Sequence, residues 1–264
     1  MVRFILVVAL TTLLCADTLM QSVQKMIGPG SYAQNRLILS TVFSQRERFY
    51  KDGRINYLKV SQVLKRLGFI PESFKSAANQ SILFHSFVSS PLFLRLGMGA
   101  MEGGGAFDYG FDRLQRDEDG MVIGFVYRSS HAFDLPGALK FLENRGAKVL
   151  GVERVGSGWR LFCDPSQALL VPRGALSKER VDEPLWFNVS RMEAIQIHSH
   201  PKNHWHPLIA MYDRDLRPLG LIDMSEQKRS LRLSLPKGCY YIKISDKYTI
   251  KNIKYGLRIQ GIKG

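Results

Sequence analysis

Cysteine is scarce in this chain, with three among 264 residues, so disulfide bonds cannot be its main source of stability. Eleven prolines and 23 glycines are too few for a collagenous protein. After the first twenty residues no apolar run approaches the roughly 18 residues of a membrane-spanning helix. The 45% apolar and 23% charged residues that are present indicate a folded chain of two or three domains.

Acidic residues are also in the minority, with 23 Asp and Glu against 37 Lys and Arg and a formal net charge of +14. The excess lies at the two ends of the chain. Residues 17–78 hold ten basic and four acidic residues, residues 176–264 hold sixteen and nine, and the middle is close to neutral. Because a basic surface attracts anions, we expect the terminal parts to contact an acidic partner.

The first sixteen residues have the layout of a secretory signal peptide. Arg3 supplies a positive start, residues 4–14 are apolar, and Ala16 is a small residue at a cleavage point. Cys15 raises the alternative of a lipoprotein, but Leu14 before it is not small. We therefore predict export to the periplasm, cleavage after Ala16 and no membrane span in the mature chain.

Removal of that segment would leave two cysteines, Cys163 and Cys239. Both fall in patterns typical of strands, so we expect two buried thiols. A disulfide between them is the alternative, because an exported protein folds in an oxidising compartment.

The first two thirds of the chain pass from a helical period to alternating short elements. Residues 17–78 predict helices, with Ile55 and Leu64 on one apolar face and Gly68 at the end of the last helix. In residues 79–165 the expected strands are 82–88, 107–114, 121–127, 148–155 and 159–163, and the expected helices are 91–101 and 135–144. This βαββαβ order with one extra strand predicts a ferredoxin-like, split βαβ domain.

The last third reads as strands only. Pro172, Gly174 and Pro184 mark residues 166–184 as a linker. Strands are then expected at 185–190, 194–198, 208–212, 219–223, 230–235, 239–244 and 253–259. Seven short strands at this spacing predict a jelly-roll-like β-sandwich over residues 185–264, so the expected fold class is α+β.

Two resemblances bear on this organisation. Residues 213–219 and the stretch Leu-Pro-Lys-Gly-Cys-Tyr-Tyr-Ile-Lys-Ile at 235–244 resemble the small sandwiches of the pre-peptidase C-terminal type, which are appended to secreted bacterial enzymes. Through residues 51–55, 63–68 and 244–252, the wider chain resembles an uncharacterised family of exported Gram-negative periplasmic proteins. These resemblances imply location and architecture, and they supply no catalytic residues.

The sharpest local feature is a group of four histidines within nine residues, namely His198, His200, His204 and His206. Two His-x-His pairs on a strand would direct ligands to one side, and imidazole suits Zn²⁺, Cu²⁺ or Ni²⁺. The group holds no carboxylate or cysteine to complete a catalytic set. We expect a polar loop without a cofactor, and a metal site is the alternative.

The C-terminal part is also rich in aromatic residues. Trp205 is expected to be exposed, because it stands in a loop of His, Pro and Asn, and an exposed ring can stack on a sugar. The lysines expected to meet acidic groups are Lys202, Lys243, Lys247, Lys251 and Lys254. Lys243 should point outward, because Ile242 and Ile244 on either side of it point inward.

Two other patterns have ordinary structural explanations. The glycines at 97–99 and 103–105 do not follow the strand-loop-helix order of a nucleotide site, and the second group suits a helix exit. Ser129, His131 and Asp134 are neighbours in sequence, which rarely makes a catalytic triad, and Asp134 suits a helix N-cap.

The predicted function is therefore that of a non-catalytic binding or scaffold protein of the cell envelope. Its expected partner is an acidic component such as peptidoglycan, lipid headgroups or a protein assembly. Nucleic acid is not expected, because no binding motif for it is present and an exported protein rarely meets it. The alternatives are a metal-handling protein that uses the histidine loop and an envelope hydrolase with unrecognised catalytic residues.

Overall fold

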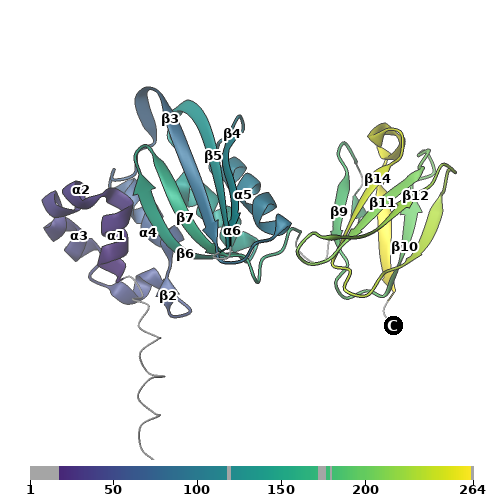
Figure 1. Ribbon diagram of the computed structural model, residues 1–264, viewed down its shortest axis with the longest axis horizontal. Coiled ribbons are helices and arrows are strands. Elements are labelled where there is room, and N and C mark those ends of the chain that lie inside the picture. Colours follow the sequence, from purple (N-terminus) through teal and green to yellow (C-terminus); the bar gives the residue numbers. More distant parts are fainter. Residues whose placement is uncertain (1–17, 118–119, 172–176, 179, 263–264) are drawn as a thin grey trace, which may run out of the picture. The chain divides into compact units, whose positions relative to one another are not determined.

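The computed structural model describes residues 18–117, 120–171, 177–178 and 180–262, and it shows a mixed α+β protein (Figure 1). The predicted signal peptide lies outside these residues. The described residues divide into a first unit, made of those up to residue 87, residues 100–143 and residues 148–164, and a second unit, made of residues 88–99, residues 144–147 and those from residue 165 onward. None of the described helices has the length and apolar character needed to cross a membrane.

The N-terminal part of the first unit is helical, as the sequence predicts. Its elements are α1 (Leu19–Ile27), α2 (Pro29–Gln34), α3 (Arg36–Val42), the 3₁₀ helix η1 (Arg46–Phe49) and α4 (Tyr57–Arg66). A capping box begins α1, in which the backbone N–H groups of Gln21 and Thr18 each donate to the other residue's side chain. Helices α1 and α4 contact strand β6 (Lys148–Val155), so this helical segment and the sheet form one body.

A hairpin of β1 (Tyr50–Lys51) and β2 (Arg54–Ile55) interrupts these helices. Its turn residues Asp52 and Gly53 have φ values of 51° and 73°, as in a type I′ turn. Glycine adopts that conformation without strain, and aspartate tolerates it. Only helices were predicted here, because two-residue strands are too short to show an alternating pattern.

A five-stranded sheet in the order β4-β5-β3-β7-β6 completes the first unit. Its other strands are β3 (Ser73–Ser86), β4 (Gly110–Asp117), β5 (Gly120–His131) and β7 (Gly158–Asp164). Strands β3 and β7 are parallel, and all other neighbours are antiparallel. Residues 73–78, predicted to belong to the helical segment, are the largely exposed first part of β3, which pairs with β5 at Ser73 and Ala78.

The helices α5 (Pro91–Gly103) and α6 (Leu135–Asn144) follow β3 and β5 in the predicted chain order. The sheet order differs from the simple ferredoxin-like one, because β7 lies between β3 and β6. The α+β class is thus confirmed, and the ferredoxin-like assignment is not. The glycines at 103–105 form the exit of α5, because Gly105 has a φ of 80°, and a Cβ at Gly104 would also overlap the Phe133 ring.

The second unit contains two four-stranded antiparallel sheets, in the orders β13-β10-β15-β8 and β12-β11-β14-β9. The strands are β8 (Ser177–Lys178), β9 (Leu185–Asn188), β10 (Ala194–Ser199), β11 (Pro207–Tyr212), β12 (Pro218–Asp223), β13 (Ser230–Ser234), β14 (Tyr241–Asp246) and β15 (Leu257–Ile262). Buried residues of both sheets form one apolar core between them. The last strand begins later than predicted, because residue 253 ends the 3₁₀ helix η2 (Ile250–Ile253).

Part of the predicted linker, residues 166–184, belongs to this sandwich. Strand β8 pairs with β15, and the Val181 side chain is buried in the core between the sheets. The Val181 N–H also donates to the Lys254 carbonyl. The predicted linker is too long, because a two-residue edge strand is too short to show an alternating sequence pattern.

Cys163 in β7 and Cys239 before β14 are both buried and free, as predicted. Burial raises the pKa of the Cys163 thiol to about 12, so this thiol stays protonated at neutral pH. Both cysteines therefore behave as small apolar residues of the two cores.

Candidate functional site

The loop before β11 is folded into the core of the sandwich. Trp205 is fully buried, and its indole Nε1–H donates to the Ser245 carbonyl at 3.0 Å. The prediction that Trp205 is exposed is therefore wrong. The backbone explains the difference, because the Lys228 N–H donates to the Trp205 carbonyl and the His204 N–H donates to the Asn252 carbonyl.

Asn203 fixes the first half of this loop. Its buried side chain donates from Nδ2 to the Gly256 carbonyl and to the Ser199 hydroxyl. Its Oδ1 accepts from the Tyr255 N–H at 3.1 Å. The loop and the turn at Tyr255 are thereby held side by side.

Asp246 plays the same part for the turn after β14. Its Oδ1 accepts from the N–H groups of Tyr248 and Thr249 and from the Asn252 side chain at 2.9–3.0 Å, and its Oδ2 accepts from the His206 N–H at 2.7 Å. Burial alone would raise the pKa of Asp246, but these hydrogen bonds outweigh it and hold the pKa below its ordinary value. The ionised carboxylate thus fixes the chain that enters η2.

These two buried anchors arrange basic side chains around Tyr255, which is 41% exposed. The ammonium groups of Lys254 and Lys202 lie 4.9 and 5.8 Å from the centre of the Tyr255 ring, and the His200 ring centre lies 5.5 Å from it. Lys251 lies in η2 and Lys254 directly follows that helix, so the two lysines are three residues apart on the same turn of the chain. We call these five residues the Tyr255 cluster.

No ion pair within the described part of the chain neutralises the three lysines of the Tyr255 cluster. Their charge is thus available to an external anion. A lysine over an exposed aromatic ring is also held by about 0.5–1 kcal/mol of cation–π attraction. The structure therefore places two of the five predicted lysines, Lys202 and Lys254, over one aromatic ring, with Lys251 nearby in η2.

The other two predicted lysines lie elsewhere. Lys243 points outward from β14, as predicted, because its two neighbours in the strand are fully buried. Its ammonium lies 5.7 Å from the centre of the Trp186 ring. Lys247 pairs with Asp223 at 2.8 Å, and the hydrogen bond to this carboxylate raises the pKa of the lysine. Lys247 is therefore already neutralised within the chain.

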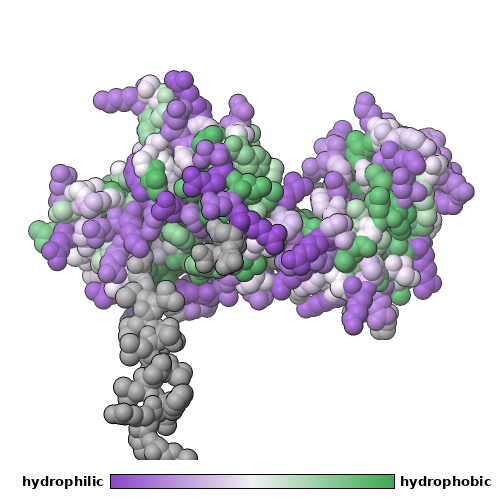
Figure 2. Space-filling view, viewed as in Figure 1, coloured by the Kyte–Doolittle hydropathy of each residue, from purple (hydrophilic) through white to green (hydrophobic). Residues whose placement is uncertain are grey.

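Lys243 belongs to the outer face of the sheet β12-β11-β14-β9, which carries an aromatic pair. The ring centres of Trp186 and Tyr212 are 5.2 Å apart, and Leu221 on the same face is 63% exposed. Figure 2 shows hydrophobic residues gathered in a band over the middle of this unit, where Figure 1 places β11 and β12. Trp186 was missed, although it stands between two buried strand residues, and that alternation was the signal that could have found it.

The four histidines do not gather on one side of a strand. Strand β10 ends at residue 199 and β11 begins at residue 207, so only the first histidine lies in a strand. Each has a different neighbour, namely Ser230 for His198, Tyr255 for His200, Gln227 for His204 and Asp246 for His206. Among the residues that the structure describes, no group of three His, Cys, Asp or Glu side chains could hold a metal ion.

Ser129, His131 and Asp134 are not assembled as a catalytic triad. The Asp134 carboxylate pairs with Lys65 at 2.9 Å, and the Ser129 hydroxyl accepts from the His131 backbone N–H. Asp134 directly precedes α6, at the position expected of an N-cap. Ser129 and His131 therefore lie at the end of β5, and Asp134 lies in the connection to α6.

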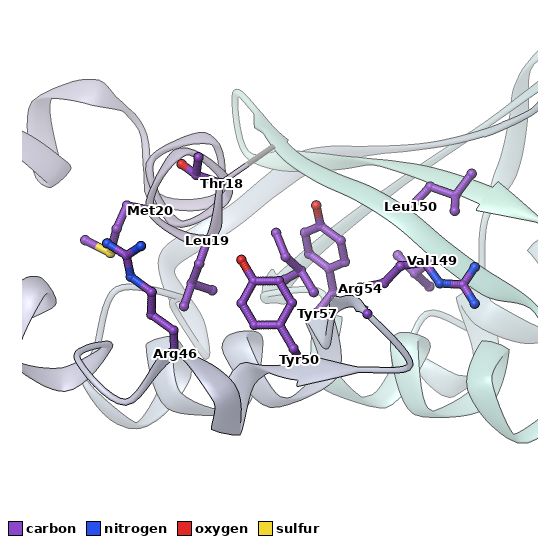
Figure 3. Close-up of a pocket in the computed structure, with 11 residues that line it drawn as sticks. Thr18, Leu19, Met20, Arg46, Tyr50, Arg54, Tyr57, Val149 and Leu150 are labelled. Atoms are coloured by element: carbon purple, nitrogen blue, oxygen red, sulfur yellow. The ribbon is translucent and has the colours of Figure 1, made fainter. Parts of the chain in front are cut away.

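The first unit contains a pocket of about 370 Å³ between α1, the β1–β2 hairpin and β6 (Figure 3). Its most buried residues are Leu19, Tyr57 and Val149, each at most 9% exposed. Arg46 and Arg54 line its rim, and no Asp or Glu is among the described residues that line it. The lining comes from distant stretches of the chain, so no local motif predicted it.

No family model, no curated protein and no solved structure matches this chain. The resemblances to pre-peptidase C-terminal sandwiches and to exported periplasmic proteins therefore stay predictions. What the protein binds has to be argued from its own surfaces, the Tyr255 cluster and the pocket.

Proposed function

We propose that this protein is a non-catalytic binding protein of the cell envelope that holds an acidic glycan polymer, with peptidoglycan as its partner. The observation that carries the proposal is the Tyr255 cluster, in which two ammonium groups flank a part-exposed ring and no described carboxylate pairs with them. An aromatic face suits the apolar side of a sugar ring, and ammonium groups suit the carboxylates of the polymer. The same pairing of lysine and ring recurs at Lys243 and Trp186.

Periplasmic location is part of this proposal. The basic start, apolar run and small residue within residues 1–16 support export and cleavage.

We also propose the finer fold of each part of the chain. Eight antiparallel strands in two sheets support a jelly-roll-like sandwich, and the order β3-α5-β4-β5-α6-β6 supports a ferredoxin-like domain with one inserted strand.

Sedimentation of the purified protein with peptidoglycan sacculi tests the proposal. The triple variant K202E/K251E/K254E should bind sacculi about tenfold more weakly at 0.1 M salt, because three attractive contacts become repulsive. Raising the salt from 0.1 to 1 M should weaken binding by the parent protein in the same way, because the Debye length shrinks from about 10 to 3 Å. Tyr255→Leu should weaken binding further than Tyr255→Phe, which keeps the ring.

The matched control is R191E/R232E/K237E, which changes the net charge equally at exposed positions of the second unit outside the Tyr255 cluster. It should keep most of the binding. Equal losses in the two triple variants, or binding that is the same at 0.1 and 1 M salt, would show that the cluster does not recruit the partner.

The metal-handling alternative concerns His198, His200, His204 and His206, which the structure does not bring together. Titration of Zn²⁺ into the parent protein and into a variant with all four replaced by alanine separates the two ideas. We expect equal responses. A saturable response confined to the parent protein would establish a metal site in the loop.

A further inference from the structure

We infer that the pocket of the first unit binds a single-chain anionic amphiphile, a molecule with one alkyl chain and a carboxylate or phosphate head. Three features of the pocket point to such a ligand, namely its size, its apolar floor and its guanidinium groups without a counter-charge. The pocket shares no residue with the Tyr255 cluster, so this ligand and the proposed glycan partner are tested independently.

The size and floor of the pocket suit one alkyl chain. Its volume of about 370 Å³ lies near the lower end of the roughly 300–1,000 Å³ of small-molecule sites. Leu19 and Val149 form a buried base, and Leu150, which also lines the pocket, is 39% exposed, so a ligand there meets carbon atoms. The Tyr57 hydroxyl is hydrogen-bonded to the buried Ser22 hydroxyl at 3.1 Å, so its polar tip is satisfied within the protein.

The rim supplies positive charge. Arg46 comes from η1 and Arg54 from β2, and both side chains are exposed. Within the described residues neither guanidinium has an ion pair, and no Asp or Glu lines the pocket. A guanidinium presents a planar fork of donors that matches a carboxylate or a phosphate. An anionic head at the rim and an apolar chain on the floor would satisfy both parts of the pocket.

Figure 3 separates the two guanidinium groups, with the rings of Tyr50 and Tyr57 between them. Arg46 lies at the end where Thr18, the N-cap of α1, and Met20 in its first turn also line the pocket. The N-terminal end of a helix carries partial positive charge, which adds to that of the arginine. The anionic head therefore binds at the Arg46 end, and the alkyl chain runs along the rings toward Arg54.

Calorimetric titration of the purified protein with four ten-carbon probes, each below its micelle-forming concentration, tests the assignment. Decanoate and decyl phosphate carry anionic heads, decanol is uncharged, and decyltrimethylammonium is a cation. At least one anion should bind about tenfold more tightly than decanol, and the cation should bind most weakly. The ratio of the two anions distinguishes a fatty acid from a phosphate-headed lipid as the source of the ligand.

Arginine variants locate the head. Arg46→Gln should weaken binding of the preferred anion by about tenfold, and Arg54→Gln should weaken it by a smaller factor. Arg48→Gln is the matched control, because Arg48 lies in the same 3₁₀ helix and is exposed but does not line the pocket. Thermal melting should show that all three variants fold. Decanol binding as tightly as both anions, or equal affinities of the Arg46 and Arg48 variants, would overturn the assignment.

Discussion

The Tyr255 cluster and the pocket of the first unit both place cations beside aromatic rings, yet they are suited to different ligands. In the cluster, lysine ammonium groups stand over a ring that is 41% exposed. In the pocket, the floor residues are at most 9% exposed and the guanidinium groups stand only at the rim. An exposed surface of lysines binds a polymer through many weak contacts, whereas an apolar pocket floor removes one face of an alkyl chain from water.

The difference shows that an excess of basic residues can serve two kinds of recognition. Contacts between exposed charges weaken as salt is added, because salt screens them. Burial of an alkyl chain is not screened in that way. The net charge of +14 therefore indicates that the protein attracts anions. The residues around each cation determine which anion binds there and which interaction holds it.

The largest effect is expected from a substitution in the core beneath the Tyr255 cluster, which should leave the pocket of the first unit intact. Trp205→Ala deletes a fully buried ring and its hydrogen bond to Ser245, so it should destabilise the second unit by about 3–5 kcal/mol. Urea unfolding followed by circular dichroism measures this loss. Sacculus binding should fall with it, whereas decanoate binding should be retained.

Trp186→Ala is the matched control, because that ring is only half-buried on the outer face of its sheet. It should cost about 1 kcal/mol. Equal destabilisation by the two variants would mean that the Trp205 side chain is not packed in the core of the second unit. Loss of decanoate binding in the Trp205 variant would mean that the two sites are not independent.

The contrast between the two tryptophans also shows what the sequence could supply. Helix α6 and strand β6 match their predicted bounds, because each has a strong local period. Lys243 was placed correctly for the same reason. The strand at residues 73–78 was not predicted, because the stretch shows no alternation of apolar and polar residues and pairs with β5 only at Ser73 and Ala78.

The two sites depend on contacts that no local pattern contains. The Asn203 side chain that folds the histidine loop bonds to a residue 53 positions away, and Asp246 bonds to one 40 positions away. With these bonds in place Trp205 is buried and Tyr255 is 41% exposed, whereas the sequence predicted an exposed Trp205. The pocket likewise joins α1, the hairpin and β6, which lie far apart in the sequence.

A smaller loss is expected when the second anchor of the cluster is weakened. Asp246→Asn replaces one acceptor oxygen by an amide that cannot accept from the buried N–H groups around it. One donor is then left without a partner, so the second unit should lose about 2 kcal/mol in urea unfolding at pH 7. Sacculus binding should weaken too, because η2 carries Lys251 and begins just after this carboxylate.

The pH dependence of the same pair of proteins gives a second measurement. The pKa of Asp246 is lower in the folded protein than its unfolded value of about 3.9, so its contribution is present above that pH and is lost as the pH falls below it. The difference between parent and variant should therefore shrink below about pH 4. Asp213→Asn is the control, because one oxygen of Asp213 accepts both of its hydrogen bonds and an amide oxygen can do the same. A difference that stays constant down to pH 2 would mean that the Asp246 charge does not stabilise the fold.

The smallest effect is expected from substitution of Lys247. This lysine can be compared with Lys254 on the same basic surface. Lys247 lies close in sequence to Lys251 and Lys254, but its ammonium is 2.8 Å from the Asp223 carboxylate. Exposed ion pairs of this kind contribute little to stability, because water screens them, so Lys247→Gln should leave the melting temperature nearly unchanged. Lys254→Gln makes the same change of charge at a lysine that has no described ion pair.

Sacculus binding by these two glutamine variants therefore distinguishes direct contact with the Tyr255 cluster from attraction by the net charge of the second unit. If the Tyr255 cluster is the site, Lys254→Gln should weaken binding by a factor of about 2–5, because one direct contact is lost, and Lys247→Gln should not change it. If the net charge of the second unit alone attracts the polymer, the two variants should lose equally, because each lowers that charge by one. An equal loss would therefore mean that the Tyr255 cluster is not a site for the polymer and that the net charge of the second unit attracts it.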